Sequence, residues 1–102
     1  MRRNVTINRN KMDDKNNIEE IAEVLSRTKN KDLIFDFFES ILTETELKTV
    51  SSRWEIVKLL DQGITQRKIA RDLHLSLCKI TRGSKELKKE NSPLKKLIHK
   101  VD

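Results

Sequence analysis

Residues that interrupt helices are scarce in this sequence. Its 102 residues include two Gly and one Pro, so the chain is predicted to be helical and not a turn-rich β-fold. Large apolar residues are also few, with no Tyr, one Trp and three Phe. A chain of this length buries a modest fraction of its surface, and it has room for one small domain only.

Signals for membrane insertion, export and metal binding are missing too. No run of about 18 apolar residues exists, which excludes a membrane-spanning helix. The start of the chain, Met1-Arg2-Arg3-Asn4-Val5, is basic, but no apolar segment of a signal peptide follows. The single cysteine, Cys78, excludes an internal disulfide, and no Cys/His cluster has metal-ligand spacing. We therefore expect a cytoplasmic protein that holds no metal or cofactor.

Positive charge is concentrated in the second half of the chain. Residues 1–50 carry nine basic and ten acidic side chains, whereas residues 51–102 carry 13 basic and six acidic ones. The excess begins after Gln62. A basic half of this kind indicates a polyanionic partner, most often nucleic acid, although a solvated lysine-rich surface would have the same composition.

Helical periodicity divides the chain into an arm and a helical domain. Residues 1–16 are polar and lack periodicity, so we expect a mobile arm there. Residues 17–102 are predicted to form an all-α domain without strands. Its six helices are expected at 17–26, 32–42, 44–62, 66–73, 77–89 and from residue 93 onward.

Several helix ends carry local signals. Thr43 and Glu46 form a capping box, Thr65 caps the next helix, and Ser92-Pro93 begins the last one. Gly63 is predicted to end the long helix with a left-handed backbone. The side chains of that helix expected to face inward are Leu47, Val50, Trp54, Val57 and Leu60.

The segment from Asp32 to Leu42 is the most apolar in the sequence. Its apolar side chains lie on more than one face of the predicted helix, and such a helix needs cover on more than one side. One small subunit offers little cover, so we expect a second chain to supply it.

Residues 66–89 have the pattern of a helix-turn-helix. Ile69, Ala70 and Ile80 form the inner faces, and Ala70 provides the small residue that two closely crossing helices need. His74 occupies the turn, where it tolerates a positive φ. Cationic and hydrogen-bonding side chains suited to phosphates and base edges lie on the outer faces, and we expect DNA contacts from Gln66, Arg67, Lys68, Ser76, Cys78, Lys79 and Thr81.

Gly83 interrupts the second helix of this motif. A glycine within a helix costs about 1 kcal/mol relative to alanine. Either the helix ends here, or a flat group must approach the backbone where any Cβ would clash.

The stretch from Ile41 to Lys88 resembles the tryptophan repressor family. The resemblance is carried by Leu42-Thr43, Arg53, Gly63-Ile64-Thr65-Gln66-Arg67 and, most specifically, Ile80-Thr81-Arg82-Gly83-Ser84 with Leu87-Lys88. The order of six helices matches as well, so the resemblance extends over about residues 17–102.

This resemblance implies an entwined homodimer that represses tryptophan biosynthesis genes by binding double-stranded operator DNA with L-tryptophan as co-repressor. Arg82 would bind the ligand carboxylate, Arg53 would stack on the indole ring, and Gly83 would let the ring lie close to the backbone. Thr43 and the carbonyls near Ser40 and Leu42, from the partner subunit, would complete the ammonium end. At Glu86 the family usually has Ser, and this carboxylate would either bind the ammonium group or repel the ligand carboxylate.

Two rival functions remain open at this stage. A related helix-turn-helix regulator that does not respond to tryptophan would share most of these motifs. A basic RNA-associated module would share the charge, but no exposed aromatic platform or Gly-rich loop is expected here. An enzyme is the least expected class, because no nucleophile–base pair, metal set or phosphate-binding loop is visible.

Overall fold

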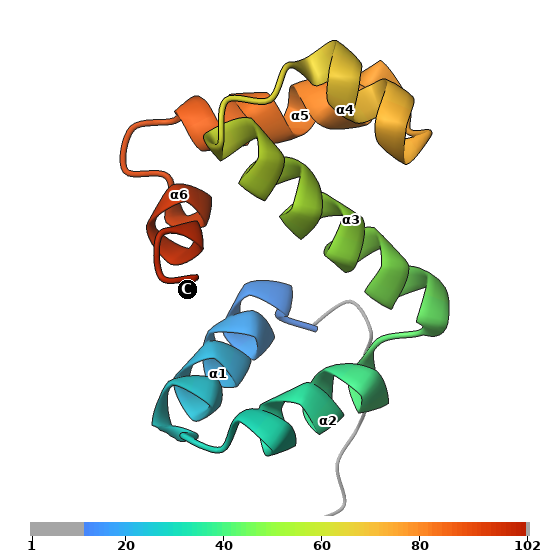
Figure 1. Cartoon of the computed structure of the whole chain (residues 1–102). Helices are drawn as coiled ribbons and strands as arrows, with labels where there is room; N and C mark the ends of the chain where they lie inside the picture. The colour runs from blue at the N-terminus through green and yellow to red at the C-terminus, as the bar shows by residue number, and fades with distance from the viewer. Residues whose placement is uncertain (1–11, 102) are drawn as a thin grey trace, which may run out of the picture. The chain divides into compact units, whose positions relative to one another are not determined.

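A computed structural model describes residues 12–101 of the chain. These residues form six α-helices and no strand (Figure 1), which confirms the predicted all-α class. The chain divides between Ile41 and Leu42 into two compact units, where the sequence predicted one helical domain over residues 17–102. None of the helices between residues 12 and 101 combines the length and apolar composition that crossing a membrane requires.

The first unit contains α1 (Asp14–Arg27) and α2 (Lys31–Ile41). Residues 1–11 of the predicted arm lie outside the described residues, and α1 begins at Asp14, three residues before the helix start predicted at residue 17. The reason is a local cap, since the Asp13 side chain accepts a hydrogen bond from the backbone N–H of Asn16 at 3.0 Å. An Asp at the N-cap favours a helix start at this position.

Neither helix of the first unit has a fully buried residue. The apolar side chains that the two helices turn toward each other are Ile21, Leu25, Ile34 and Phe37, all of them half-buried. Phe35 and Phe38 remain 59% and 41% exposed. The apolar surface predicted for α2 is therefore present and largely uncovered within this unit.

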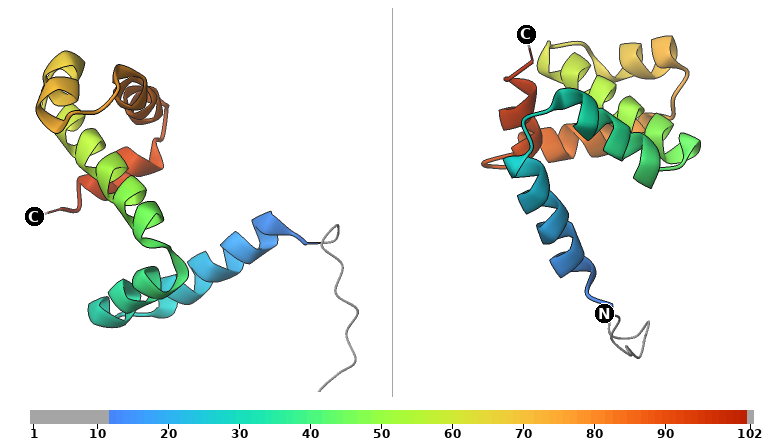
Figure 2. Two further views of the ribbon diagram at one scale, coloured as in Figure 1. Left: turned by 90° about the vertical axis from the view of Figure 1, so that its right-hand side faces the viewer. Right: turned by 90° about the horizontal axis from the view of Figure 1, so that it is seen from below.

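The second unit contains α3 (Glu44–Asp61), α4 (Gln66–Leu73), α5 (Leu77–Lys88) and α6 (Pro93–Ile98). The last three helices gather toward the carboxyl-terminal end of α3, as the views in Figure 1 and Figure 2 agree. The core is small and consists of Ile56, Ile69 and Ile80, with Leu59, Leu60, Ile64, Ala70 and Leu75 packed against it.

The predicted helix ends of this unit are confirmed. Thr43 and Glu46 form both hydrogen bonds of the capping box, at 2.8 and 3.1 Å. Gly63 has a φ of +88°, and the Thr65 and Ser92 side chains cap α4 and α6. Side-chain burial on α3 differs from the prediction at two positions, because Val50 is 50% exposed whereas Ile56 is 2% exposed.

Candidate functional site

A cavity of about 380 Å³ lies between α3 and α5, within the second unit. On each helix the lining residues recur at intervals of three or four positions, which places them on one face. The lining from α3 is Thr45, Lys48, Thr49, Ser52, Arg53, Ile56 and Val57. The remaining walls are formed by Lys79, Arg82, Gly83 and Glu86 of α5 and by Leu94 of α6.

The fold brings four of the predicted ligand-binding residues to this cavity. Arg53 comes from α3, whereas Arg82, Gly83 and Glu86 come from α5, so residues 29 or more positions apart in the sequence share one site. The other three predicted residues, Ser40, Leu42 and Thr43, do not line it.

Those three residues have local roles in the structure. The Ser40 hydroxyl donates to the backbone carbonyl of Asp36 at 2.8 Å, and Leu42 is half-buried. The Thr43 hydroxyl accepts from the backbone N–H of Glu46 in the capping box.

Gly83 lies at a close contact between α3 and α5. The helix continues through it to Lys88, which excludes a helix end as the reason for the glycine. A Cβ built at this position would lie 3.1 Å from Cγ2 of Ile56 and 3.6 Å from Cγ2 of Val57. The group that approaches the backbone here is thus a side chain of α3, and the same contact forms part of the cavity wall.

Positive charge dominates the cavity. Lys48, Arg53, Lys79 and Arg82 face one carboxylate, Glu86. Glu86 forms an ion pair with Lys89 at 2.9 Å, and Lys48 pairs with Glu44 at 3.6 Å. Within residues 12–101, Arg53, Lys79 and Arg82 form no ion pair.

The chemistry of this cavity suits an anion with an apolar body. A guanidinium offers a fork of N–H donors that matches the two oxygens of a carboxylate. Ile56, Val57 and Leu94 provide apolar walls, where a ring or alkyl group would displace water.

The helix-turn-helix is formed by α4, a short turn and α5. His74 ends α4 with a left-handed backbone, at φ 55° and ψ 43°, as predicted for this turn. Ile69 and Ile80 are 1% and 0% exposed, so burial of one isoleucine from each helix holds the pair together.

The residues predicted to contact DNA lie on these two helices and the turn, and most are exposed. The exposed members are Arg67, Lys68, Ser76, Cys78 and Lys79. Gln66 and Thr81 are half-buried, and the Thr81 hydroxyl donates to Oε1 of Gln66 at 3.0 Å. This hydrogen bond links the first turn of α4 to the middle of α5.

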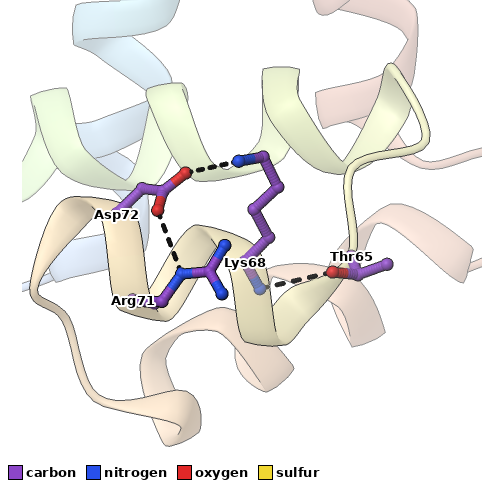
Figure 3. Close-up of polar contacts among 4 residues, drawn as sticks. All are labelled: Thr65, Lys68, Arg71 and Asp72. Atoms are coloured by element: carbon purple, nitrogen blue, oxygen red, sulfur yellow. Dashed lines mark hydrogen bonds and ion pairs between the residues drawn. The ribbon is translucent and has the colours of Figure 1, made fainter.

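A small ion-pair network lies on the surface of α4 (Figure 3). The carboxylate of Asp72 accepts from Nζ of Lys68 at 2.8 Å and from Nε of Arg71 at 3.3 Å. The hydrogen bond from Lys68, followed by that from Arg71, holds the pKa of Asp72 below its ordinary value. Lys68 is therefore engaged with Asp72 when no other anion is present.

Sequence reasoning missed most of the α3 side of the cavity. Lys48, Thr49, Ser52 and Ile56 were not singled out, and Val57 was expected only to face inward, although all five lie within one to five positions of Arg53 on the same helix. Helical spacing from Arg53 was the signal that could have found them. Leu94 of α6 carried no such signal.

Comparison with known proteins identifies the family. Residues 16–102 match the family described as Trp repressor protein. A Trp operon repressor homolog of Chlamydia caviae is 34% identical over 84 residues, which cover 81% of this chain and 83% of that protein. A Trp operon repressor homolog of Chlamydia trachomatis serovar L2 is 36% identical over 76 residues, which cover 74% of this chain and 81% of that protein. No solved structure matches the chain.

The family match over residues 16–102 includes the helix-turn-helix and the α3 and α5 segments that form the cavity. The identities of 34–36% hold over most of the chain. The protein belongs to the Trp repressor family, a family of DNA-binding transcription regulators and not of enzymes.

Proposed function

We propose that the chain is a homodimeric repressor that binds the operator of tryptophan biosynthesis genes when L-tryptophan occupies the cavity between α3 and α5. One observation carries this proposal. Arg53, Arg82 and Gly83 meet at a cavity that has the second helix of the helix-turn-helix, α5, as one of its walls. A ligand in this cavity would therefore contact the helix that reads DNA.

The proposed ligand contacts follow from the lining of the cavity. Arg82 binds the carboxylate through paired N–H donors, and Arg53 stacks its guanidinium plane on the indole ring. Ile56 and Val57 form the apolar wall. Ser40, Leu42 and Thr43 are assigned to the cavity of the second subunit, near the ligand ammonium group.

The proposed DNA interface consists of the outer residues of α4 and α5. Arg67, Lys68 and Lys79 neutralise backbone phosphates, which supplies affinity without sequence preference. The shorter polar side chains contact phosphates or base edges. These are Gln66, Ser76 and Cys78, and Thr81 lies in the same interface beside Gln66.

The proposed homodimer rests on the uncovered apolar surface of the first unit. Leu33, Phe35 and Ile41 are each more than half exposed on α2, and α1 and α2 bury no residue completely. Exposed apolar side chains gathered on one short helix favour an interface between proteins. A second copy of the chain brings the same apolar surface and also provides the second helix-turn-helix that a two-fold operator requires.

Calorimetric titration with L-tryptophan tests the ligand. We expect saturable binding at one site per chain and a loss of roughly tenfold or more in affinity for Arg82→Gln, because the carboxylate loses its paired donors. Lys85→Gln removes an exposed charge from the same helix and serves as the matched control. Absence of binding by the wild-type protein at millimolar L-tryptophan would refute the co-repressor role.

A second candidate function has one observation in its favour. Glu86 places a carboxylate in the cavity, where it would repel the carboxylate of an amino acid if the ligand lies with that end toward it. A regulator of the same family that binds operator DNA without tryptophan, or with another anion, would fit this feature. Operator binding of equal strength with and without L-tryptophan would favour this alternative.

A further inference from the structure

We propose that Thr81 is a positioning residue that acts on DNA through Gln66 and not by its own contact. This inference rests on the proposed operator binding. It goes further because it assigns different roles to two residues that the sequence placed together in one interface. The starting observation is the hydrogen bond from the Thr81 hydroxyl to Oε1 of Gln66, at 3.0 Å.

The hydrogen bond from Thr81 sets the orientation of the Gln66 amide. An amide side chain has an acceptor oxygen at one corner and an NH₂ group with two donors at the other. Because the oxygen accepts from Thr81, the NH₂ group points away from that hydroxyl. Thr81 thereby fixes which end of the amide faces the helix pair and which end faces outward.

The outward end of the amide is not buried. Nε2 of Gln66 forms no hydrogen bond among residues 12–101, and none of the buried side-chain nitrogen or oxygen atoms in that part of the chain lacks a partner. Nε2 is consequently not buried. It offers two donors at the first position of α4, beside the exposed Arg67 and Lys68.

Core packing restrains the position of Thr81. Thr81 follows Ile80, which is 0% exposed, and Thr81 is itself half-buried. The backbone that carries its hydroxyl is therefore anchored in the packed core between α4 and α5. A donor pair fixed in this way binds a phosphate or base acceptor without first losing the rotamer freedom of a mobile glutamine.

The predicted ligand of the Gln66 NH₂ group is a DNA acceptor, either a phosphate oxygen or a base-edge acceptor. Thr81 would contribute to that contact only through the orientation of the amide. Removing the Thr81 hydroxyl should therefore weaken DNA binding when Gln66 is present and should leave DNA binding unchanged when Gln66 is absent.

A double-mutant cycle tests this dependence. The probe is a duplex enriched by the wild-type protein, with 1 mM L-tryptophan, from a pool of random sequences. Thr81→Val should weaken binding roughly two- to tenfold, the range that corresponds to one net hydrogen bond, whereas Thr81→Ser should restore affinity close to wild type. In a Gln66→Ala background, Thr81→Val should have no further effect.

Additive effects of the two substitutions would show that Thr81 contacts DNA directly. This result would overturn the inference about Thr81 and leave the proposed function in place. Failure of the wild-type protein to enrich any duplex would overturn the proposed function together with this inference.

A second measurement does not depend on DNA. The side-chain amide resonances of Gln66 in the free protein should shift in Thr81→Val and not in Thr81→Ser, and unchanged resonances in both would contradict the fixed amide.

Discussion

At the scale of single residues, Gly83 lies both at the contact between α3 and α5 and in the wall of the proposed ligand cavity. Gly83→Ala should weaken L-tryptophan binding about tenfold, because the new Cβ would lie 3.1 Å from Cγ2 of Ile56 and would shift a wall of the cavity. The free energy of unfolding should change little, since alanine is favoured in a helix by about 1 kcal/mol and offsets part of the clash.

Calorimetry and thermal unfolding measure these two effects separately. Lys85→Ala, at an exposed position of the same helix, is the control and should leave both unchanged. Wild-type ligand affinity in Gly83→Ala would show that the α3–α5 contact does not limit the cavity.

Asp72 is the second residue whose role the structure defines. It engages both Lys68 and Arg71, so a DNA phosphate must compete with its carboxylate for these cations. Asp72→Asn should therefore strengthen DNA binding and steepen the dependence of log K on log salt by about one ion. The measurement is fluorescence anisotropy across a salt series.

Glu90→Gln is the matched control, because it removes the same charge from the same unit without contacting either cation. Equal changes in the two variants would show that net charge alone matters and that the ion-pair network does not restrain Lys68.

Residues whose roles depend on distant contacts could not be placed from the sequence. Periodicity predicted that Val50 faces inward, but α4, α5 and α6 pack near the other end of α3, so Val50 stays 50% exposed while Ile56 is buried. Arg53, Arg82 and Glu86 were selected from the family resemblance, and Gly83 was selected also from its position inside a predicted helix. Only the crossing of α3 and α5 shows that they share a cavity.

At the scale of elements, the helix ends were the most predictable features. Caps form between residues three apart, as in Thr43 with Glu46 and Ser92 with Lys95, so their signals are complete in a short stretch of sequence. The start of α1 also depends on a local cap, Asp13. The prediction missed this start because Asp13 was assigned to the polar arm.

The capping box of α3 makes a pH-dependent contribution to stability. The hydrogen bond from the Thr43 backbone N–H, and then the bond with its hydroxyl, lowers the pKa of Glu46. A lowered folded-state pKa means that the contribution is present above the unfolded-state pKa and is lost as pH falls through the folded-state value. Glu46→Gln should therefore flatten the fall in stability below about pH 4.5, the ordinary range of a glutamate carboxyl.

Urea unfolding at a series of pH values between 3 and 6 measures this effect on wild-type and variant protein. Glu44→Gln removes a carboxylate from the same first turn that takes no part in the capping box. It should leave more of the pH dependence in place. Equal flattening in both variants would indicate the helix dipole, and not the capping box, as the source.

At the scale of the whole molecule, the apolar surface of α2 predicts that assembly depends on Phe35. This side chain is 59% exposed, so Phe35→Ser should not remove core packing within its own unit. It should instead weaken the homodimer and increase the monomer fraction in sedimentation at micromolar concentration. Leu77→Ser, which alters a 48% exposed side chain on α5, should leave the dimer intact, and a dimer unaffected by Phe35→Ser would place the interface elsewhere.

The coupling between ligand and DNA gives the last prediction. If L-tryptophan strengthens operator binding by a factor within the usual range of roughly 5 to 150, operator DNA must strengthen L-tryptophan binding by the same factor. The physical basis is that α5 contributes Arg82 and Gly83 to the cavity and Lys79 to both the cavity and the outer surface, so one arrangement of α5 serves both ligands. Calorimetric titrations of L-tryptophan with and without duplex, and of duplex with and without L-tryptophan, should close this thermodynamic cycle. Lys79→Met should reduce the coupling factor equally in both sets of titrations. If DNA affinity changes while the coupling factor stays the same, Lys79 contributes to the DNA contact only.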